Sequence, residues 1–128
     1  MDLDVDETLD GQVALVTGAT RGIGAAIASA LSDIGATVYA GARDPGDVED
    51  DDLRPVRLDV TEDAEIRAAV DRIADETGRL DVLVNNAGRA PPGDPLDEAD
   101  VAEIDATLAT NLRGPVLLAR EALPLLPD

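Results

Sequence analysis

A glycine-rich segment, Thr17-Gly18-Ala19-Thr20-Arg21-Gly22-Ile23-Gly24, separates a short apolar run from a stretch with helical spacing. The run at residues 13–16 has the composition of a buried parallel strand, and apolar positions repeat with helical spacing from Ile23 to Ile34. At a strand-to-helix turn, glycines let backbone N–H groups approach a diphosphate beside the positive helix N-terminus. The segment therefore predicts a dinucleotide-binding loop. The alternative is a plain turn that uses glycine for positive φ.

Strand-like and helix-like patterns alternate along the rest of the chain. We predict strands at residues 13–16, 37–40, 55–58 and 80–84, and helices from residue 22 to Gly35, from an N-cap at Thr61 to Gly78, and from about residue 97 to 123, with a loop or poor helix at 44–52. This alternation predicts an α/β protein with a parallel sheet and right-handed crossovers. The length suits one domain. We expect a flexible acidic lead-in at 1–10 and a dinucleotide-binding domain at 11–128.

The chain is strongly acidic. It carries 28 acidic and 10 basic residues, the latter all arginine, for a net charge of −18. A nucleic-acid partner is disfavoured because nothing offers a broad cationic face. We interpret the acidity as a solvated surface and hypothesise a halophilic source, because concentrated salt screens the self-repulsion of such a surface.

Other features of the composition exclude further classes of site and location. The sequence has no cysteine and no histidine, which excludes disulfides, thiolate nucleophiles and Cys-based metal sites, and we predict no metal site. It has no apolar run of about 18 residues and no basic start followed by an apolar stretch. We therefore expect a cytoplasmic protein with no membrane partner.

The glycine spacing G-x-x-x-G-x-G resembles the TGxxxGIG motif of the short-chain dehydrogenase/reductase family. Asn85-Asn86-Ala87-Gly88 is identical to the NNAG motif of that family, and Asp59-Val60 and Asn111-Leu112-Arg113-Gly114 also match its patterns. The four motifs follow in the family order over essentially the whole chain. The resemblance implies a Rossmann-type doubly wound parallel sheet, here incomplete with about four strands in the order 3-2-1-4. It also implies hydride transfer between NAD(P)(H) and an alcohol or carbonyl.

The resemblance further implies a role for each motif. Gly18, Gly22 and Gly24 would frame the diphosphate, in a turn that also includes Thr17, Thr20 and Arg21. Ile23 would lie beside the nicotinamide half, Asp59 and Val60 would border the adenine, and Asn86, Ala87 and Gly88 would line the ribose side. The alternative for each is a structural role, such as a core position for Ile23.

Charge favours NADP over NAD as the cofactor. NAD-preferring sites place an acid near the end of the second strand, where it binds the ribose 2′-OH. Here Arg43 occupies that region and Arg21 lies inside the glycine turn. Two guanidinium groups suit a 2′-phosphate, which arginine binds through paired hydrogen bonds. The neighbouring Asp44 could instead bind the ribose of NAD, so NAD remains the less favoured alternative.

The family performs its chemistry with a Ser and a Tyr-x-x-x-Lys pair on one helix face, and this sequence contains no lysine. Tyr39 and Arg43 have the same spacing, but a strand separates them by about 13 Å and arginine does not tune a phenol as lysine does. We expect the chain to end before the strand that carries the Ser, and to be inactive when isolated. The alternative is a non-catalytic NADP(H)-binding module or gene remnant.

Two further expectations follow from the end of the chain. Asn111 matches the family Asn that holds a proton-relay water through its backbone carbonyl. Pro115 lacks an N–H, so the Asn111 carbonyl should lose its helical partner and the helix should kink; a packing kink without chemistry is an equal alternative. The fourth strand should form a bare apolar edge, so we expect self-association, aggregation or a partner chain that completes the sheet.

Overall fold

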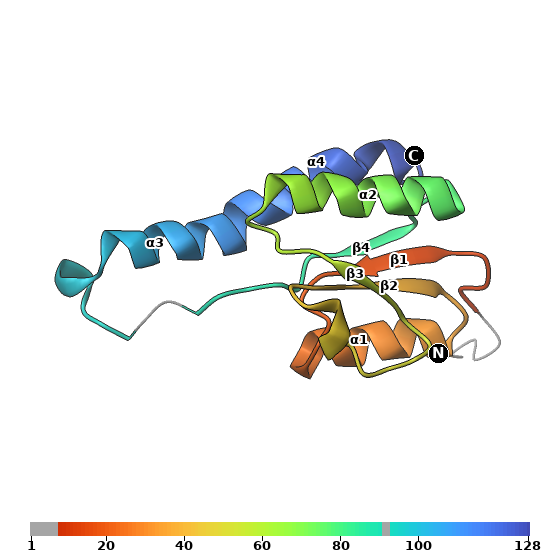
Figure 1. Cartoon of the computed structure of the whole chain (residues 1–128), viewed down its shortest axis with the longest axis horizontal. Coiled ribbons are helices and arrows are strands. Elements are labelled where there is room, and N and C mark those ends of the chain that lie inside the picture. Colours follow the sequence, from red (N-terminus) through yellow and green to blue (C-terminus); the bar gives the residue numbers. More distant parts are fainter. Residues whose placement is uncertain (1–7, 91–92) are drawn as a thin grey trace, which may run out of the picture.

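The computed structural model describes residues 8–90 and 93–128. Its centre is a parallel sheet of four strands in the order β3-β2-β1-β4 (Figure 1). The strands are β1 (Val13–Val16), β2 (Thr37–Ala42), β3 (Arg54–Arg57) and β4 (Val82–Val84). The fold class and the strand order 3-2-1-4 are thus confirmed. The first seven residues of the lead-in predicted at 1–10 lie outside the described part of the chain.

β1 is an interior strand, and its four residues are all apolar and all buried. It pairs in parallel with β2 from Val13↔Thr37 and with β4 from Ala14↔Val82. Among the described residues β4 pairs with β1 alone, and its three residues are half-buried. β4 therefore forms one edge of the sheet, as expected, and β3 forms the other.

Helices cover both faces of this sheet. α1 (Gly22–Asp33) lies on one face, and α2 (Asp63–Thr77) and α4 (Gly114–Ala122) lie on the other (Figure 1). Successive strand residues point to opposite faces. Leu15 accordingly belongs to the apolar cluster that contains Ile66 of α2 and Leu118 of α4, whereas Val16 belongs to the cluster that contains Ala28 of α1. This two-sided burial holds the β1–α1 turn at the carboxyl end of the sheet.

The start of α2 differs from the prediction. Thr61 is not its N-cap, because α2 begins at Asp63 and its N-cap is Glu62, which makes no side-chain capping bond. The Thr61 hydroxyl instead donates to Asp59 Oδ1 at 2.7 Å, a local turn bond that competes with capping. The predicted end at Gly78 is confirmed, since Gly78 has φ of 70° and follows the last helical residue.

The helix predicted from about residue 97 to 123 is an interrupted helical run. It comprises η2 (Leu96–Glu98), α3 (Val101–Leu108), the π-helical segment η3 (Ala109–Arg113), α4 and η4 (Leu123–Leu125). The Gly114 N–H donates to the Ala109 carbonyl across the π turn, next to Pro115. The predicted irregularity around Asn111 is therefore present, and it takes the form of a π turn.

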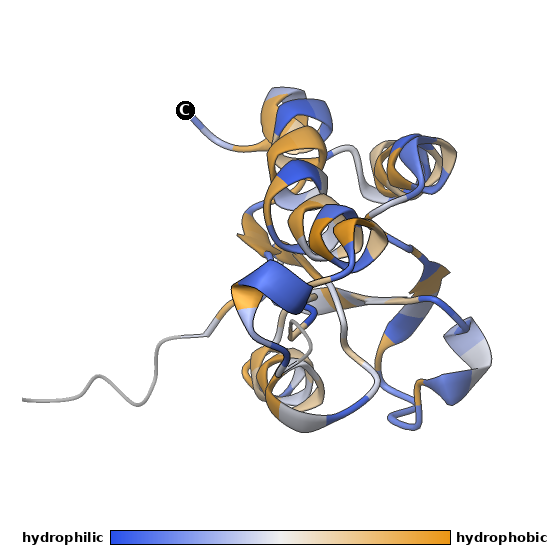
Figure 2. Cartoon of the chain, turned by 90° about the vertical axis from the view of Figure 1, so that its left-hand side faces the viewer, coloured by the Kyte–Doolittle hydropathy of each residue, from blue (hydrophilic) through white to orange (hydrophobic). Residues whose placement is uncertain are grey.

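α3 extends beyond the sheet, away from the other helices (Figure 1). Large apolar side chains stay exposed along the run, among them Val101, Leu108, Leu112 and Val116; Figure 2 looks along this run and marks its apolar residues. No helix in the described part of the chain combines the length and apolar composition needed to cross a membrane.

Candidate functional site

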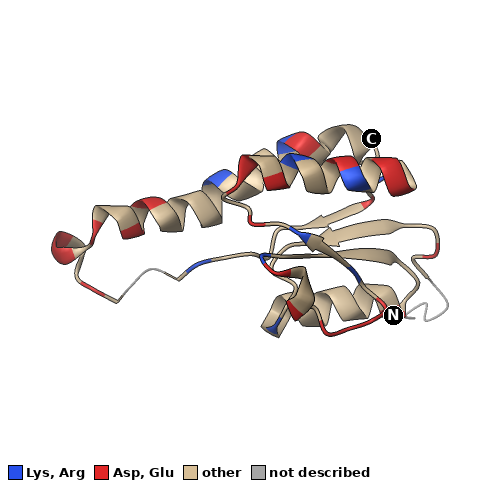
Figure 3. Ribbon diagram, viewed as in Figure 1, with Lys and Arg blue, Asp and Glu red and all other residues tan. Residues whose placement is uncertain are grey.

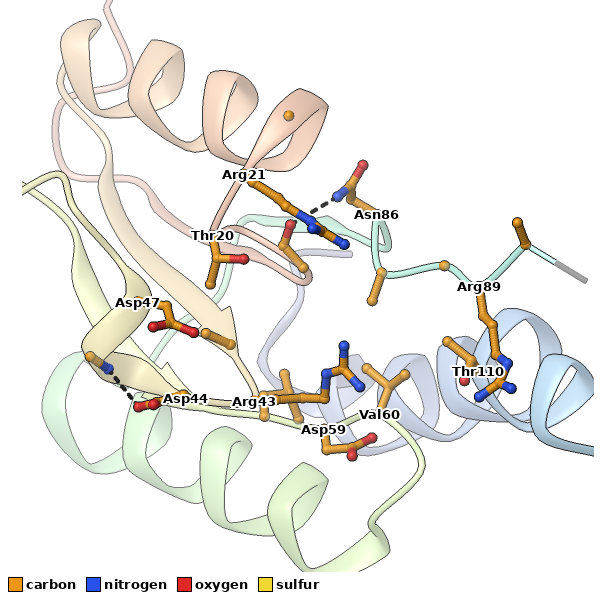
Figure 4. Close-up of a pocket in the computed structure, with 18 of the residues that line it drawn as sticks. Thr20, Arg21, Arg43, Asp44, Asp47, Asp59, Val60, Asn86, Arg89 and Thr110 are labelled. Atoms are coloured by element: carbon orange, nitrogen blue, oxygen red, sulfur yellow. Dashed lines mark hydrogen bonds between the residues drawn. The ribbon is translucent and has the colours of Figure 1, made fainter.

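The loops that follow the four strands meet at the carboxyl end of the sheet, where open parallel sheets bind their ligands. They enclose a cleft of about 1000 Å³ (Figure 4). Its lining is made of Gly18, Thr20, Arg21, Gly22, Ala42, Arg43, Asp44, Gly46, Asp47, Glu49, Leu58, Asp59, Val60, Asn86, Ala87, Gly88, Arg89, Ala90 and Thr110. Ten of the fourteen residues predicted from the sequence motifs lie in this lining. Thr17, Ile23, Gly24 and Asn111 do not.

The glycine turn is packed tightly against the loop after β4. A Cβ atom on Gly24 would lie 2.2 Å from the Gly18 carbonyl oxygen and 2.4 Å from Asn86 Nδ2. Asn86 Nδ2 donates to that same Gly18 oxygen at 3.2 Å (Figure 4). Gly24 therefore permits the close approach of α1, Asn86 and the turn, and lies beneath the cleft surface.

Thr17 joins the same two loops from below. Its buried hydroxyl accepts hydrogen bonds from the Asn86 and Ala87 N–H groups, both at 2.9 Å, and donates to the Val84 carbonyl at 3.4 Å. These bonds link residues that are about 70 positions apart in sequence. Thr17 thus orients the loop after β4 toward the cleft without lining it.

Two arginine side chains face the cleft from different loops. Arg21 precedes α1, and Arg43 follows β2; both are exposed and border the same space (Figure 4). Asp44, the residue that left NAD open, also lines the cleft, but its Oδ1 accepts the Gly46 N–H at 3.0 Å and caps η1 (Pro45–Asp47). The Asp44 carboxylate therefore already has a local partner.

Asp59 and Val60 form the wall that follows β3. Asp59 Oδ1 accepts the Thr61 N–H at 2.9 Å, and the Asp59 N–H donates to Glu65 Oε1 at 3.1 Å. Val60 is buried, and a Cβ on Gly114 would lie 2.7 Å from its carbonyl oxygen. Gly114 therefore lets the helical run approach this wall closely.

Asn111 and Ile23 lie outside the lining. The Asn111 side chain forms two bonds with the backbone of Arg89: its Oδ1 accepts the N–H at 2.7 Å, and its Nδ2 donates to the carbonyl at 2.7 Å. Its neighbours Arg89 and Thr110 do line the cleft. The side chain of Ile23 is 74% exposed, so the alternative of a core position is wrong.

Several residues that line the cleft belong to none of the sequence motifs: Ala42, Gly46, Asp47, Glu49, Leu58, Arg89, Ala90 and Thr110. Most of them come within a few residues of a strand end, and that position was the signal available in the sequence. Asp47 and Glu49 lie in the segment interpreted only as an acidic loop. Thr110 is at the site because the π-helical run passes the loop after β4.

Tyr39 lies away from the cleft, which agrees with its rejection as a catalytic residue. It is fully buried in β2, and its hydroxyl donates to Glu76 Oε1 at 2.6 Å. The guanidinium groups of Arg54 and Arg72 each lie 5.5 Å from the ring centroid. Burial raises the pKa of the Tyr39 phenol, and the bond to Glu76 raises it further. This environment keeps the phenol protonated.

A glycine turn at the mouth of a parallel sheet, with helices on both faces, defines a Rossmann-type α/β protein. The family model for short chain dehydrogenases matches residues 12–128. The chain therefore belongs to the short-chain dehydrogenase/reductase family, a family of oxidoreductases, as the four sequence motifs indicated.

Two curated relatives illustrate the similarity. D-threitol dehydrogenase of Mycolicibacterium smegmatis is 43% identical over 129 residues, which cover 94% of this chain and 49% of the relative. L-fucose dehydrogenase of Oryctolagus cuniculus is 41% identical over 119 residues, covering 89% of this chain and 42% of the relative. The chain thus spans about half the length of the curated relatives it matches.

Solved structures agree with the fold. A metagenomic short-chain oxidoreductase in complex with NADP is 42% identical and superposes with a TM-score of 0.87, covering 93% of this chain and 58% of that one. The 3-ketoacyl-(acyl-carrier-protein) reductase of Brucella melitensis, complexed with NADH, is 32% identical with a TM-score of 0.85, covering 92% of this chain and 51% of that one. Both nicotinamide cofactors thus occur among similar structures.

Proposed function

We propose that this chain binds a nicotinamide dinucleotide in the cleft, NADP in preference to NAD, as the cofactor-binding part of a short-chain oxidoreductase. The whole protein would transfer hydride between NADP(H) and an alcohol or carbonyl. The cofactor supplies the hydride donor or acceptor. The residues of this chain bind and orient it.

The observation that carries this proposal is the open N-terminus of α1. Its N-cap, Arg21, makes no side-chain capping bond, and no acid lies in the first turn. At Gly22, which has φ of +59°, no atom lies within 4 Å of the position a Cβ would take. Uncapped N–H groups beside a glycine surface and an arginine are what a diphosphate requires. The other motif residues that line the cleft would contact the ribose and adenine portions.

The preference for NADP rests on charge at the end of β2. The strand ends at Ala42, where an acid could have bound the 2′-OH, and Arg43 follows it. The Asp44 carboxylate is turned to the Gly46 N–H. Arg43, with Arg21 across the cleft, offers the donors that a 2′-phosphate prefers.

We further propose that the isolated chain binds the cofactor without turnover. The sequence has no lysine, and its one tyrosine is buried away from the cleft, so no Tyr–Lys acid/base pair can form within these residues. The Asn111 carbonyl, in the π-helical segment, would hold a water in the proton relay of the whole enzyme. A non-catalytic NADP(H)-binding module is the second candidate, and the same absence of lysine favours it.

We also propose that the β4 edge is covered by another polypeptide. Unpaired backbone groups along an apolar edge strand favour pairing with a further strand. Either a second copy or a segment that completes the sheet would supply it. Light scattering of the purified chain should show a mass above one chain, and a stable monomer at high concentration would contradict self-association.

Composition supports a salt-rich cytoplasm as the working environment. The chain has 28 acidic and 10 basic residues and no lysine, a composition that suits concentrated salt. We propose that the protein works in such a cytoplasm.

Calorimetric titration with NADPH and NADH, followed by a turnover assay on simple ketones, tests the function. We expect tighter binding of NADPH and no turnover. Replacing Arg43 by Ala should weaken NADPH binding by about tenfold or more, because a charge-assisted contact is lost, and should leave NADH binding nearly unchanged. Arg67→Ala is the matched control, since Arg67 is exposed on α2 and does not line the cleft.

Each outcome of that titration decides one part of the proposal. Failure of both cofactors to bind would contradict the function itself. Equal affinity for NADH and NADPH would contradict the preference for NADP. Turnover by the pure chain would contradict the proposed division between binding and chemistry.

A further inference from the structure

The segment between β2 and β3 places a dense row of carboxylates beside the cleft. Residues 44–52 contain six acids and no basic residue: Asp44, Asp47, Glu49, Asp50, Asp51 and Asp52. Three of them, Asp44, Asp47 and Glu49, line the cleft itself. Figure 4 shows Asp44 and Asp47 on the same side as Arg43, and Figure 3 shows the acids that follow η1. We refer to residues 44–52 as the acidic wall.

The acidic wall is anchored to α1. The Ser29 hydroxyl of α1 donates to Asp50 Oδ2 at 2.7 Å, and the Asp52 N–H donates to Asp50 Oδ1 at 2.9 Å. Val48 and the buried Leu53, on either side of Asp50, belong to the apolar cluster of α1 and the sheet. The hydrogen bond from Ser29 lowers the pKa of Asp50, so its charge is retained well below neutral pH. These contacts hold the backbone of the acidic wall, from Val48 to Leu53, against α1 and the sheet.

The arginines of the cleft attract the phosphates of a cofactor, but they offset the repulsion by the acidic wall only at short range. Arg21 and Arg43 face the cleft, whereas Arg89 pairs with Glu103 of α3. NADP(H) carries a diphosphate and a 2′-phosphate. A guanidinium attracts a phosphate at contact distance, where salt screens little, while the wall and the net charge of −18 repel it through water. The Debye length falls from about 30 Å at 0.01 M to about 3 Å at 1 M salt, so salt removes the repulsion before the contacts.

We infer that dissolved salt is a positive effector of the cofactor site: NADPH binds more tightly as ionic strength rises, through screening of the acidic wall. This inference rests on the proposed function. The effect is larger for NADPH than for NADH, because the extra phosphate belongs beside Arg43, next to the wall. This dependence on salt is the opposite of the usual one, in which salt weakens the binding of a phosphate to basic groups.

Calorimetric dissociation constants for both cofactors test the inference, measured from the lowest KCl concentration that keeps the native circular dichroism spectrum up to 2 M. Over this range of KCl we expect the dissociation constant for NADPH to fall by about tenfold, and the dissociation constant for NADH to fall less. Tetramethylammonium chloride should have the same effect, because the mechanism is screening and needs no cation bound to a carboxylate. An NADPH constant that rises with salt, or an effect confined to KCl, would overturn the inference.

A pair of double variants isolates the wall. Asp47 and Glu49 make no side-chain hydrogen bond among the described contacts, so D47N/E49Q removes charge without breaking one. D71N/D75N removes the same charge from the exposed face of α2, outside the cleft lining. D47N/E49Q should bind NADPH several-fold more tightly at low salt and show a clearly smaller salt response than the wild-type protein. D71N/D75N, which removes the same net charge, should keep a response close to that of the wild-type protein.

The two double variants also distinguish the role of the acidic wall from the proposed function. Equal salt responses in both double variants would overturn the role of the wall while leaving the proposed function intact. No binding of either cofactor at any salt concentration would overturn the proposed function, and the inference with it.

Discussion

At the scale of single residues, Thr17 holds the two loops of the site together. Its hydroxyl accepts hydrogen bonds from the half-buried N–H groups of Asn86 and Ala87 and donates to the Val84 carbonyl. Thr17→Val keeps the shape but leaves the Ala87 N–H unpaired, while the Asn86 N–H keeps its bond to the Val84 carbonyl at 3.1 Å. We therefore expect a loss of about 1–3 kcal/mol in the free energy of unfolding. Urea denaturation measures this. Thr17→Ser keeps the hydroxyl and is the control; equal stability of the two variants would contradict the role.

The motifs located Thr17 and Gly24 correctly in sequence but did not reveal that both lie beneath the cleft. Their positions depend on Asn86, which approaches only because β4 pairs with β1. Likewise, no motif indicates that Asp44 caps η1, because this contact depends on the path of the loop after β2. The role of a site residue could be predicted where a motif specifies the local backbone. Its contacts could not be predicted where the partner comes from a strand that is distant in sequence.

At the scale of elements, Asp81 fastens β4 to β1. Its Oδ2 accepts the Val13 N–H at 2.8 Å and the Arg79 Nε–H at 2.9 Å. The Arg79 guanidinium holds the pKa of Asp81 below its ordinary value, and the Val13 N–H adds to this. A carboxylate with a depressed folded-state pKa stabilises the fold above the unfolded pKa, about 3.9, and loses that contribution as pH falls through the folded-state value.

We therefore expect Asp81→Asn to lower the melting temperature at pH 7, with the gap to the wild-type protein narrowing below about pH 4. Thermal melts from pH 7 to pH 2 measure the gap. Asp71→Asn, on the exposed side of α2, should show no such gap. A difference between wild type and Asp81→Asn that stays constant with pH would contradict the assignment.

The π-helical segment η3 is coupled to the loop after β4 through Asn111. Both polar atoms of its side-chain amide bond to the backbone of Arg89. Asn111→Leu should make the Arg89 amide exchange about three- to tenfold faster with deuterium, because its side-chain acceptor is removed. Leu112→Ala, an exposed neighbour in the same segment, is the control. Unchanged protection of the Arg89 amide in Asn111→Leu would show that the two hydrogen bonds between Asn111 and Arg89 do not persist in solution.

Element boundaries followed from the sequence where one local signal dominated. Gly78 ends α2 because its backbone adopts the left-handed region. The predicted N-cap at Thr61 was wrong because the Thr61 hydroxyl bonds to Asp59 instead. Pro115 correctly predicted an irregular helix, but a proline specifies only which carbonyl loses its partner. The π turn and the close approach of Gly114 to Val60 at its end could not be derived from the proline.

At the scale of the whole molecule, the dominant property is the net charge of −18. Self-repulsion opposes the compact state in dilute buffer, and salt screens it. We expect the melting temperature to rise steadily from dilute buffer to molar KCl, as followed by circular dichroism. A melting temperature insensitive to KCl would contradict the halophilic hypothesis.

The interior position of β1 also has a consequence for how the chain folds as it is synthesised. One flank of β1 can pair as soon as β2 has left the ribosome, but the other waits for β4, whose register begins at Ala14↔Val82. The nascent chain therefore carries a half-paired apolar strand while some forty further residues are made. Such long-range closure is slow compared with local helix formation. The stage most exposed to misassembly falls between the emergence of β2 and that of β4.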